Sequence, residues 1–356
     1  MDSNRYIRQT ALKEFGPQAQ IKLMKSRVLV IGAGGLGVPV LQYLNAMGVG
    51  TLGVVERDVV SISNLHRQVL YTEKDIGKSK LDVAFKKLKA QNSATRLRGY
   101  DTFLMASNAL EIIKDYDIVI DASDNFPTRY LINDACVILK KPFVYGGLQG
   151  FEGQVSIFNF KGGPTYRCLF PNMPSIDEIP NCNINGVLGV LPGIVGNLQA
   201  LETIKMITGI GEVLKGKLLL YNALDQSMQK ITFNLQEENL NIFALNNSYG
   251  IVSASPFSEI TVDELKQLIN SQGSVQIIDV RTLEEFEAYK IPNSVHIPLN
   301  ELENRYHDID LKQPIYLICQ SGKRSAVALE QLKNQFSEIA LYSVRGGINT
   351  YVAVCS

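Results

Sequence analysis

The stretch RVLVIGAGGLG at residues 27–37 decides the fold of the first part of this chain. Its first five residues are apolar and mostly β-branched, which is typical of a buried parallel strand. A run of the form G-x-G-x-x-G follows directly and leads into a helical pattern over 38–47. Glycines at this point let the backbone approach a phosphate, and the helix N-terminus supplies N–H donors. The stretch predicts nucleotide binding through Gly32, Gly34, Gly35 and Gly37.

An acidic residue follows the next predicted strand, residues 51–56, about 20 positions further on. Glu56 stands where a carboxylate would bind ribose hydroxyls. This much is compatible with an NAD-dependent oxidoreductase as well as with an ATP-using enzyme. A glycine-rich turn with only a packing role is the third alternative.

Outside this βαβ opening, strands and helices continue to alternate, after a helical arm over 1–25. The pattern predicts a doubly wound, Rossmann-like α/β domain over 1–240, a linker rich in Asn, Ser, Gly and Pro over 241–257, and a small α/β domain over 258–356. In the first domain we expect helices over 80–90, 128–140 and 197–208, and strands over 117–121, 142–145, 154–160 and 217–221. In the second we expect helices over 262–270, 283–289 and 324–334, and strands over 275–280, 315–318 and 339–344.

Composition narrows the class of protein. The 356 residues suffice for two domains, and 35 basic residues balance 35 acidic ones, so no basic excess points to nucleic acid or an anionic membrane. The polar N-terminus has no apolar core of a signal peptide, and the apolar runs are too short to span a bilayer. We expect a cytoplasmic protein. Five cysteines without a C-x-x-C pair make a disulfide framework improbable there.

Charged and polar groups gather after the acid. They lie in DVVSISNLHRQ (58–68), GKSK (77–80) and DASDN (121–125), the last of which ends a predicted strand. Arg and Lys stabilise polyphosphate charge, and Asp oxygens bind Mg²⁺. Hydride transfer needs no such set, so these residues favour phosphate chemistry over NAD.

With RYIRQ (5–9), YRCLFP (166–171) and NGVLGVLPGIVG (185–196), these motifs make the first domain resemble the MoeB/ThiF/HesA adenylyltransferases, relatives of ubiquitin-activating enzymes. The resemblance implies ATP and Mg²⁺ as cofactors, with Mg²⁺ on Asp124. It also implies a homodimer in which Arg8 reaches the partner's site. Glu56 replaces the family's more usual Asp. The other residues that it implies for ATP binding are Asp58, Asn64, Arg67, Lys80, Asp124 and Asn125.

Many members of this family hold zinc between two C-x-x-C pairs. Here Thr165 stands at the first position, Cys168 at the second, and no cysteine follows between residue 225 and Cys319. One thiolate cannot build a tetrahedral zinc site. We therefore expect no zinc, a segment over 222–236 held by packing instead, and Cys168 as a small buried apolar residue.

Two cysteines are candidates for sulfur chemistry. Cys182 lies in a polar loop without a neighbouring base, but sulfur-transferring members of the resembled family keep a cysteine in this loop. Cys319 ends a predicted strand and opens a loop at a helix N-terminus, where backbone N–H groups favour a thiolate. The rest of that expected persulfide loop is Gln320, Ser321, Gly322, Lys323, Arg324 and Ser325.

Residues 258–351 resemble a rhodanese domain through IIDVR (277–281), EEFEAYKIPNSVHIPL (284–299), CQSGKRS (319–325) and RGGINTY (345–351). The resemblance implies that Cys319 carries a persulfide and gives the chain a MoeZ-like arrangement. It departs from the usual pattern at Tyr289-Lys290, where Gly-His is common.

Together the two resemblances imply an adenylyltransferase and sulfurtransferase. The first domain would adenylate the C-terminal Gly-Gly end of a ubiquitin-like sulfur carrier of the MoaD or ThiS kind. The second would pass on sulfur from a donor such as a cysteine desulfurase or thiosulfate, and form a thiocarboxylate. Cys182 would take the acyl group or resolve a mixed disulfide. Molybdopterin, thiamine, cysteine and tRNA thiolation all remain open as pathways, and a non-catalytic scaffold is the alternative outside enzymes.

Overall fold

The computed structural model describes residues 3–174, 186–246, 249, 259–272, 275–311, 313–336 and 340–355. The chain divides into two compact units. The first comprises Met1–Arg57, Asn64–Thr72 and Ser79–Tyr249, and the second Asp58–Ser63, Glu73–Lys78 and Gly250–Ser356. In the described part of the chain, no helix is both long and apolar enough to cross a membrane.

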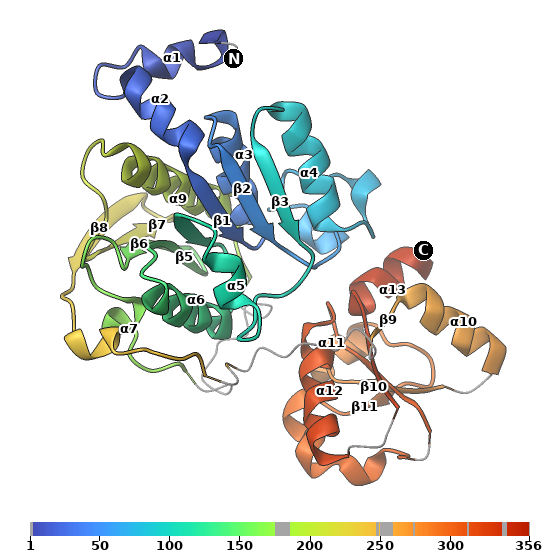
Figure 1. Ribbon diagram of the computed structural model, residues 1–356. Coiled ribbons are helices and arrows are strands. Elements are labelled where there is room, and N and C mark those ends of the chain that lie inside the picture. The colour runs from blue at the N-terminus through green and yellow to red at the C-terminus, as the bar shows by residue number, and fades with distance from the viewer. Residues whose placement is uncertain are drawn as a thin grey trace. The chain divides into compact units, whose positions relative to one another are not determined.

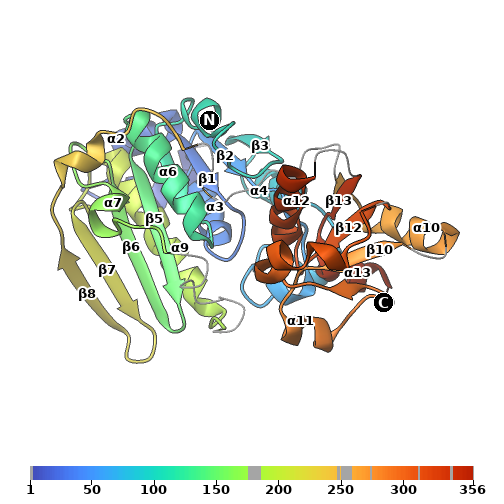
Figure 2. The same ribbon diagram turned by 90° about the horizontal axis from the view of Figure 1, so that it is seen from below.

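An eight-stranded sheet in the order β3-β2-β1-β4-β5-β6-β7-β8 forms the centre of the first unit (Figure 1). The strands from β3 to β5 pair in parallel, whereas β6, β7 and β8 add an antiparallel extension. Figure 2 shows β5 to β8 side by side. The strands are β1 (Arg27–Ile31), β2 (Thr51–Val55), β3 (Arg96–Tyr100), β4 (Ile118–Asp121), β5 (Phe143–Gln149), β6 (Glu152–Phe158), β7 (Lys217–Asn222) and β8 (Ser227–Thr232).

Strand β1 lies in the middle of the parallel part and pairs with both β2 and β4. In this register Ile31 lies beside Val55 on one side and beside Asp121 on the other. The carboxyl ends of the three strands therefore meet at one edge of the sheet. From β1 the chain adds β2 and β3 on one side, and β4 and β5 then follow on the other side of β1. Ligands of open α/β sheets bind where the strand order reverses in this way.

Helices cover both faces of this sheet. On one face α3 packs against α9, and α9 packs on β5 and β6. Helix α6 lies on the other face (Figure 2), and α5 packs against α6. In both β1 and β2 the last four of the five residues are buried, as expected for parallel strands between two helical layers. The helices are α1 (Ile7–Thr10), α2 (Gly16–Lys25), α3 (Gly37–Ala46), α4 (Lys80–Gln91), α5 (Ala109–Ile113), α6 (Phe126–Ile138), α7 (Tyr166–Leu169) and α9 (Val190–Thr208).

Three elements of the first unit go beyond the sequence prediction. Strand β3 reads RLRGY and has no fully buried residue, so the apolar run that marks a strand is missing. Strand β8 lies at the edge of the sheet and has no buried residue either. Helix α9 starts at Val190 instead of 197, because Pro192 falls in its first turn, where proline is tolerated.

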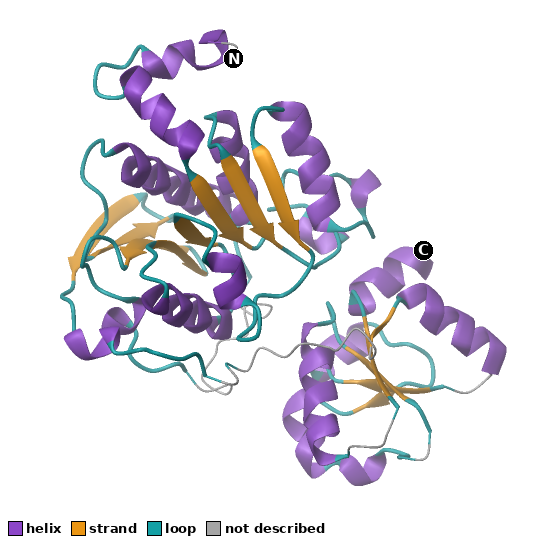
Figure 3. Cartoon of the chain, viewed as in Figure 1, coloured by secondary structure: helices purple, strands orange, loops and turns teal. Residues whose placement is uncertain are grey.

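The second unit has a parallel five-stranded sheet in the order β11-β10-β12-β13-β9. Its strands are drawn in orange in Figure 3. Side chains alternate between two apolar cores: Ile315 and Leu317 enter one, and Tyr316 and Ile318 the other. Helix α13 was not predicted. The strands are β9 (Glu259–Ile260), β10 (Gln276–Asp279), β11 (Val295–His296), β12 (Ile315–Ile318) and β13 (Leu341–Val344), and the helices are α10 (Val262–Gln272), α11 (Leu283–Ala288), α12 (Lys323–Gln335) and α13 (Gly347–Cys355).

Candidate functional site

The glycine loop follows β1 at the carboxyl edge of the first sheet. Gly32 has φ of +99°, and a Cβ atom there would lie 2.8 Å from the carbonyl oxygen of Ala122, just after β4. Only glycine tolerates both conditions. The loop then runs into α3, whose N-terminus has no side-chain cap and would present backbone N–H groups to a ligand at this edge. The loop thus has the backbone conformation that close approach of a phosphate would require.

Glu56, directly after β2, is a buried carboxylate beside this loop. Its Oε2 accepts a hydrogen bond from the backbone N–H of Ala33 at 2.9 Å, and its Oε1 accepts one from the N–H of Arg57 at 2.8 Å. The Tyr71 hydroxyl donates to the carbonyl oxygen of Ala33 at 2.9 Å. The expected ribose-binding acid therefore also holds the glycine loop to β2.

Arg67 and Asp124 lie at the same edge. A turn in which the N–H groups of Arg67 and Gln68 donate to the carbonyl oxygen of Asn64 brings the Arg67 side chain over the glycine loop, with its Cδ 3.5 Å from a Cβ placed on Gly35. Burial lowers the pKa of Arg67, and the negative charge of Asp124 partly offsets this effect. The Arg67 guanidinium therefore lies close to the glycine loop and within electrostatic reach of the Asp124 carboxylate.

Two buried ionisable residues, Asp121 and Arg129, lie next to this edge. Asp121, at the end of β4, accepts hydrogen bonds from the N–H and hydroxyl of Ser123 at 3.0 and 2.6 Å. Burial raises the pKa of Asp121, and the positive charge of Arg129 opposes that rise. The Arg129 guanidinium lies 5.3 Å from the centre of the Tyr145 ring. These groups fix the base of the loop that carries Asp124.

The other predicted ATP-site residues have different positions. Lys80 begins α4 and is buried, and Asn125 caps α6 by accepting the N–H of Thr128 at 2.9 Å. Asp58 is half-buried after β2. Arg8 is exposed on α1, which precedes the amino end of β1 (Figure 1), so it does not lie with the carboxyl-edge groups of its own chain.

Cys168 is buried, as expected, but polar groups contact its sulfur. Its Sγ accepts hydrogen bonds from the N–H groups of Thr165 at 3.4 Å and Gln236 at 3.3 Å, and from the side-chain amide of Asn239 at 3.6 Å. Burial acts to raise the pKa of Cys168, but these hydrogen bonds outweigh it, so the pKa lies below its ordinary value. Thr165, Cys168, Gln236 and Asn239 keep the three-residue spacing of two C-x-x-C pairs.

The segment over 222–236, which we expected packing to hold in place of zinc, also makes main-chain and sulfur hydrogen bonds. Strand β8 holds part of it through main-chain pairing with β7, and the sulfur of Cys168 holds Gln236. Within the described ranges, no group of three or more His, Cys, Asp or Glu side chains is arranged to hold a metal ion. Cys182 lies outside the described residues.

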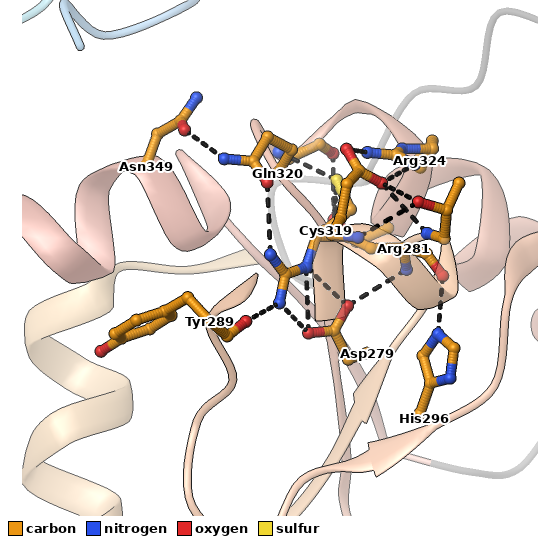
Figure 4. A network of polar contacts seen from close by, with 12 residues as sticks. Asp279, Arg281, Tyr289, His296, Cys319, Gln320, Arg324 and Asn349 are labelled. Carbon is orange, nitrogen blue, oxygen red and sulfur yellow. Dashed lines mark hydrogen bonds and ion pairs between the residues drawn. The ribbon is translucent and has the colours of Figure 1, made fainter. Parts of the chain in front are cut away.

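The second candidate centre is the loop from Cys319 to Ser325 in the second unit (Figure 4). Cys319 follows β12 and is 1 % exposed. The N–H of Gly322 donates to its Sγ at 3.1 Å, and Sγ lies 3.6 Å from the hydroxyl oxygen of Ser325. Gly322 has φ of +92°, and a Cβ there would be 3.2 Å from the backbone nitrogen of Gly346. The loop thus turns a backbone N–H onto the sulfur.

A buried guanidinium fixes the base of this loop. Arg281 pairs with Asp279 at 2.7 Å and donates to the side-chain oxygen of Gln320 at 3.3 Å (Figure 4). Gln320 in turn donates to Asn349 on α13 at 2.5 Å. Asp279 and Arg281 belong to the IIDVR motif, but nothing in the sequence indicates that Gln320 joins them to α13.

Arg324, at the end of the loop, makes a two-pronged contact with Glu285 at 2.7 Å for each bond. Burial acts to raise the pKa of Glu285, but the hydrogen bonds with Arg324 outweigh it, so this pKa lies below its usual range. Ser321 and Lys323 are partly exposed on the loop. The positive charge of Arg324 is therefore balanced within the unit.

Some residues of these centres were not assigned a role in the sequence analysis. Gln68 is buried beside the glycine loop, with its amide nitrogen 3.5 Å from a Cβ placed on Gly34. Tyr71 holds Ala33 from the same segment. Ser343 is the one small polar residue of the predicted strand IALYSV (339–344), and its spacing gives no indication of a role. Only the position of Gln68 directly after Arg67 pointed to a role.

Two family models match the chain. The ThiF family model matches residues 6–242, and the rhodanese-like domain model matches residues 261–353.

Curated relatives match both parts. The chain is 39 % identical to the adenylyltransferase and sulfurtransferase MOCS3 of Culex quinquefasciatus, over 98 % of this chain and 86 % of that protein. It is 36 % identical to the protein of that name from Arabidopsis thaliana, over 98 % of this chain and 83 % of the other. The sulfur carrier protein adenylyltransferase of Thermus thermophilus is 54 % identical over 64 % of this chain and 86 % of its own length.

Among solved structures, E. coli MccB with ATP has a TM-score of 0.58 at 22 % identity, over 66 % of this chain and 73 % of that chain. PaaA has a TM-score of 0.55 at 25 % identity, over 65 % of this chain and 74 % of the other. The similarity to MccB concerns the fold.

Proposed function

The chain belongs to the ThiF family and carries a rhodanese-like domain after it, and from this we propose that it adenylates the C-terminal carboxylate of a ubiquitin-like sulfur carrier and then sulfurates it. The full-length relatives named adenylyltransferase and sulfurtransferase support both activities. The observation that carries the proposal is the presence, on one chain, of a phosphate turn beside Arg67 and Asp124 and of a loop that aims an N–H at the sulfur of Cys319.

In the first step a carboxylate oxygen of the carrier attacks the α-phosphorus of ATP. The bond between the α- and β-phosphates breaks, and pyrophosphate leaves with its electrons. The N-terminus of α3, Arg67 and Lys80 would stabilise the added negative charge, and Glu56 would bind the ribose. Arg8 would reach this space from the partner subunit of a homodimer, since in its own chain α1 lies beyond the other end of β1.

Asp124 is the residue that would hold Mg²⁺. Its carboxylate is exposed and lies at the nucleotide edge of the sheet, and carboxylate oxygen is the ligand type that Mg²⁺ prefers. The ion would supply charge compensation to the phosphates. Asp58, Asn64 and Asn125 would complete the polar lining of the ATP site. We propose no zinc.

In the second step Cys319 takes a sulfur atom from a donor persulfide or thiosulfate. Its thiolate forms a bond to the sulfane sulfur, and the donor leaves as a thiolate or as sulfite. The terminal sulfur then attacks the carrier's acyl carbon, and AMP leaves. Attack of the Cys182 thiolate on Cys319 Sγ would release the thiocarboxylate and leave a disulfide, which an external dithiol reduces.

We place the adenylyltransferase domain at residues 1–240, the linker at 241–257 and the sulfurtransferase domain at 258–356. We further propose a cytoplasmic homodimer. Carriers of this kind are used in the molybdopterin, thiamine and cysteine pathways and in tRNA thiolation.

The test separates the two activities in the full-length protein. We expect ATP–pyrophosphate exchange that depends on a small protein ending in Gly-Gly, and a loss of about 10²- to 10³-fold in Arg67→Ala, because one charge-stabilising group is removed. Arg96→Ala, at an exposed arginine of β3, is the matched control and should keep the wild-type rate. Cys319→Ala should keep the exchange but fail to take up sulfane sulfur. Exchange that proceeds without the carrier protein would refute the proposal.

A further inference from the structure

Two buried hydroxyl groups lie next to the reactive sulfur of the second unit. Ser325, on α12, is 0 % exposed, and Ser343, on β13, is 1 % exposed. Their hydroxyl oxygens are 2.8 Å apart, and that of Ser325 lies 3.6 Å from Cys319 Sγ. The three side chains therefore form a row, Ser343–Ser325–Cys319, that starts in the sheet and ends at the sulfur.

A count of protons shows what this row does when Cys319 is a neutral thiol. A hydroxyl has one proton to donate and two lone pairs to accept with. The thiol donates to Ser325, and Ser325 donates to the carbonyl oxygen of Gly322 at 3.1 Å. Ser343 can then donate to the second lone pair of Ser325, so all three groups are satisfied.

The count changes when the sulfur is a thiolate. The sulfur has no proton left and needs donors, and one of them is the N–H of Gly322. Ser325 can become a second donor if its hydroxyl proton turns from the Gly322 carbonyl to the sulfur. That carbonyl is not left bare, because the N–H of Ala326 also donates to it, at 3.3 Å. Ser325 can thus serve both states of the sulfur without moving its oxygen.

We propose that Ser343 is a positioning residue for this exchange, an inference that rests on the sulfur-transfer function proposed above. By donating to Ser325, it occupies the lone pair that faces β13, and so leaves the Ser325 proton to alternate between the Gly322 carbonyl and the sulfur. A hydroxyl that accepts one hydrogen bond also donates a stronger one, so the effect reaches Cys319.

The surroundings of Ser343 support a specific role. Its strand neighbours Leu341 and Val344 are buried and apolar, so a hydroxyl at this position must find a partner inside the core. Two other buried serines, Ser26 and Ser156, donate to main-chain carbonyl oxygens, those of Leu23 and Lys217. Ser343 bonds instead to a side chain that contacts the sulfur.

The first experiment measures alkylation of Cys319 by iodoacetamide in the full-length protein, between pH 5 and 10, read by mass spectrometry of the peptide that contains Cys319. We expect Ser343→Ala to lower the rate at pH 7 about threefold to tenfold, the size of one lost hydrogen bond, and to move the pH of half-maximal rate upward. At high pH the rates should converge, because the thiolate is then complete. Ser343→Thr, which keeps the hydroxyl, should restore most of the rate.

Ser294→Ala is the matched control. It removes a serine hydroxyl of the same unit that donates to the carbonyl oxygen of Ile291, and it should leave the alkylation profile unchanged. A Ser343→Ala profile that is lowered equally at every pH would mean a structural defect and would overturn the proposal. An unchanged profile would overturn it as well.

A double-mutant cycle tests whether Ser343 acts through Ser325. The Ser325→Ala/Ser343→Ala variant should alkylate as slowly as Ser325→Ala alone, since the relay is already broken. Additive losses would contradict this. Alkylation reports on the thiol whether or not the protein takes up sulfur. Failure of the wild type to load sulfane sulfur would therefore reject the proposed function, without deciding the role of Ser343.

Discussion

At the scale of single residues, Glu56 is expected to bind ribose and also holds the glycine loop, and only the first role could be predicted from the sequence. Its position about 20 residues after the glycine loop predicted ribose binding. The structure adds that both carboxylate oxygens already accept backbone N–H groups, from Ala33 and Arg57. The side chain of Glu56 is longer than that of the family's usual Asp, and in this chain it reaches the backbone of the glycine loop and helps to hold it. Spacing in a sequence cannot reveal such a bond, because it depends on the path of two separate loops.

We expect Glu56→Gln to destabilise the protein by about 1–3 kcal/mol, because the amide can accept only one of the two bonds and would face the other N–H with its NH₂ group. The KM for ATP should rise in the same variant. Chemical denaturation and initial rates measure the two effects. Glu111→Gln, at an exposed glutamate of α5, is the control and should change neither. A Glu56→Gln protein of wild-type stability would contradict the holding role.

The lowered pKa of Cys168 leads to a prediction about how protein stability depends on pH. Because its folded-state pKa lies below the ordinary value of 9.0, the thiolate is favoured in the folded protein. Its contribution to the free energy of unfolding is then fully present above the unfolded-state pKa, and is lost as the pH falls through the folded-state pKa. The stability difference between the wild type and Cys168→Ala should therefore grow as the pH rises from about 7 to about 9.

Urea denaturation at several pH values measures this difference. Cys136→Ala is the contrasting control, since Cys136 is fully buried in α6 and burial raises its pKa. For that variant the difference should not increase over the same range. A Cys168→Ala difference that is constant with pH would show that the sulfur is held as a neutral thiol.

At the scale of elements, the strands that sequence analysis found are those with a buried apolar run. The stretches DIVID and IYLI fall on β4 and β12, where every strand residue is buried. The edge strands β3 and β8 were not predicted, because strands that are largely exposed have no buried apolar run. Helix α13 was overlooked for a different reason: its N-terminus is fixed by Gly347, which lies against the Cys319 loop in space but not in sequence.

The persulfide loop depends on one glycine. We expect Gly322→Ala to lower sulfane-sulfur loading at least about tenfold and to cost about 1–2 kcal/mol, because φ of +92° is unfavourable for a residue with a Cβ, and the N–H that faces Cys319 would be displaced. Loading with a radiolabelled donor and thermal unfolding measure both effects.

The matched control is Gly193→Ala in the interior of α9, where a Cβ would meet no atom within 4 Å. There the same substitution should stabilise the protein by about 0.5–1 kcal/mol, through the higher helix propensity of alanine. Equal effects of the two substitutions would show that the conformation of Gly322 has no special importance.

At the scale of the whole molecule, the order of two α/β patterns along one chain was readable from the sequence, and both families match in that order. What the sequence did not reveal is the bond between distant segments at the end of the first unit. Tyr249 is buried, and its hydroxyl donates to Asp134 at 2.6 Å, which also binds Arg167 at 2.8 Å. In the sequence this tyrosine looked like part of an unstructured, polar stretch.

We expect Tyr249→Phe to lower the free energy of unfolding by about 1 kcal/mol, because Asp134 loses one of its donors but keeps Arg167. Guanidinium denaturation measures the change. Tyr43→Phe, at an exposed tyrosine of α3, should leave the stability as it is. If the two variants behave alike, Tyr249 does not anchor the end of the first unit.

The mixed sheet of the first unit also has a consequence for the order in which it folds. Val28 of β1 pairs with Ile118 of β4, so a long loop must close before this parallel pair can form, whereas Gln149 of β5 pairs with Glu152 of β6 across a two-residue connection. Closing a short loop is faster and costs less chain entropy than closing a long one. The antiparallel hairpin is therefore expected to be the early, locally nucleated part of the sheet. The carboxyl edge formed by β1, β2 and β4, where we propose that the nucleotide binds, would then assemble late. It would be able to bind the nucleotide only once folding is nearly complete.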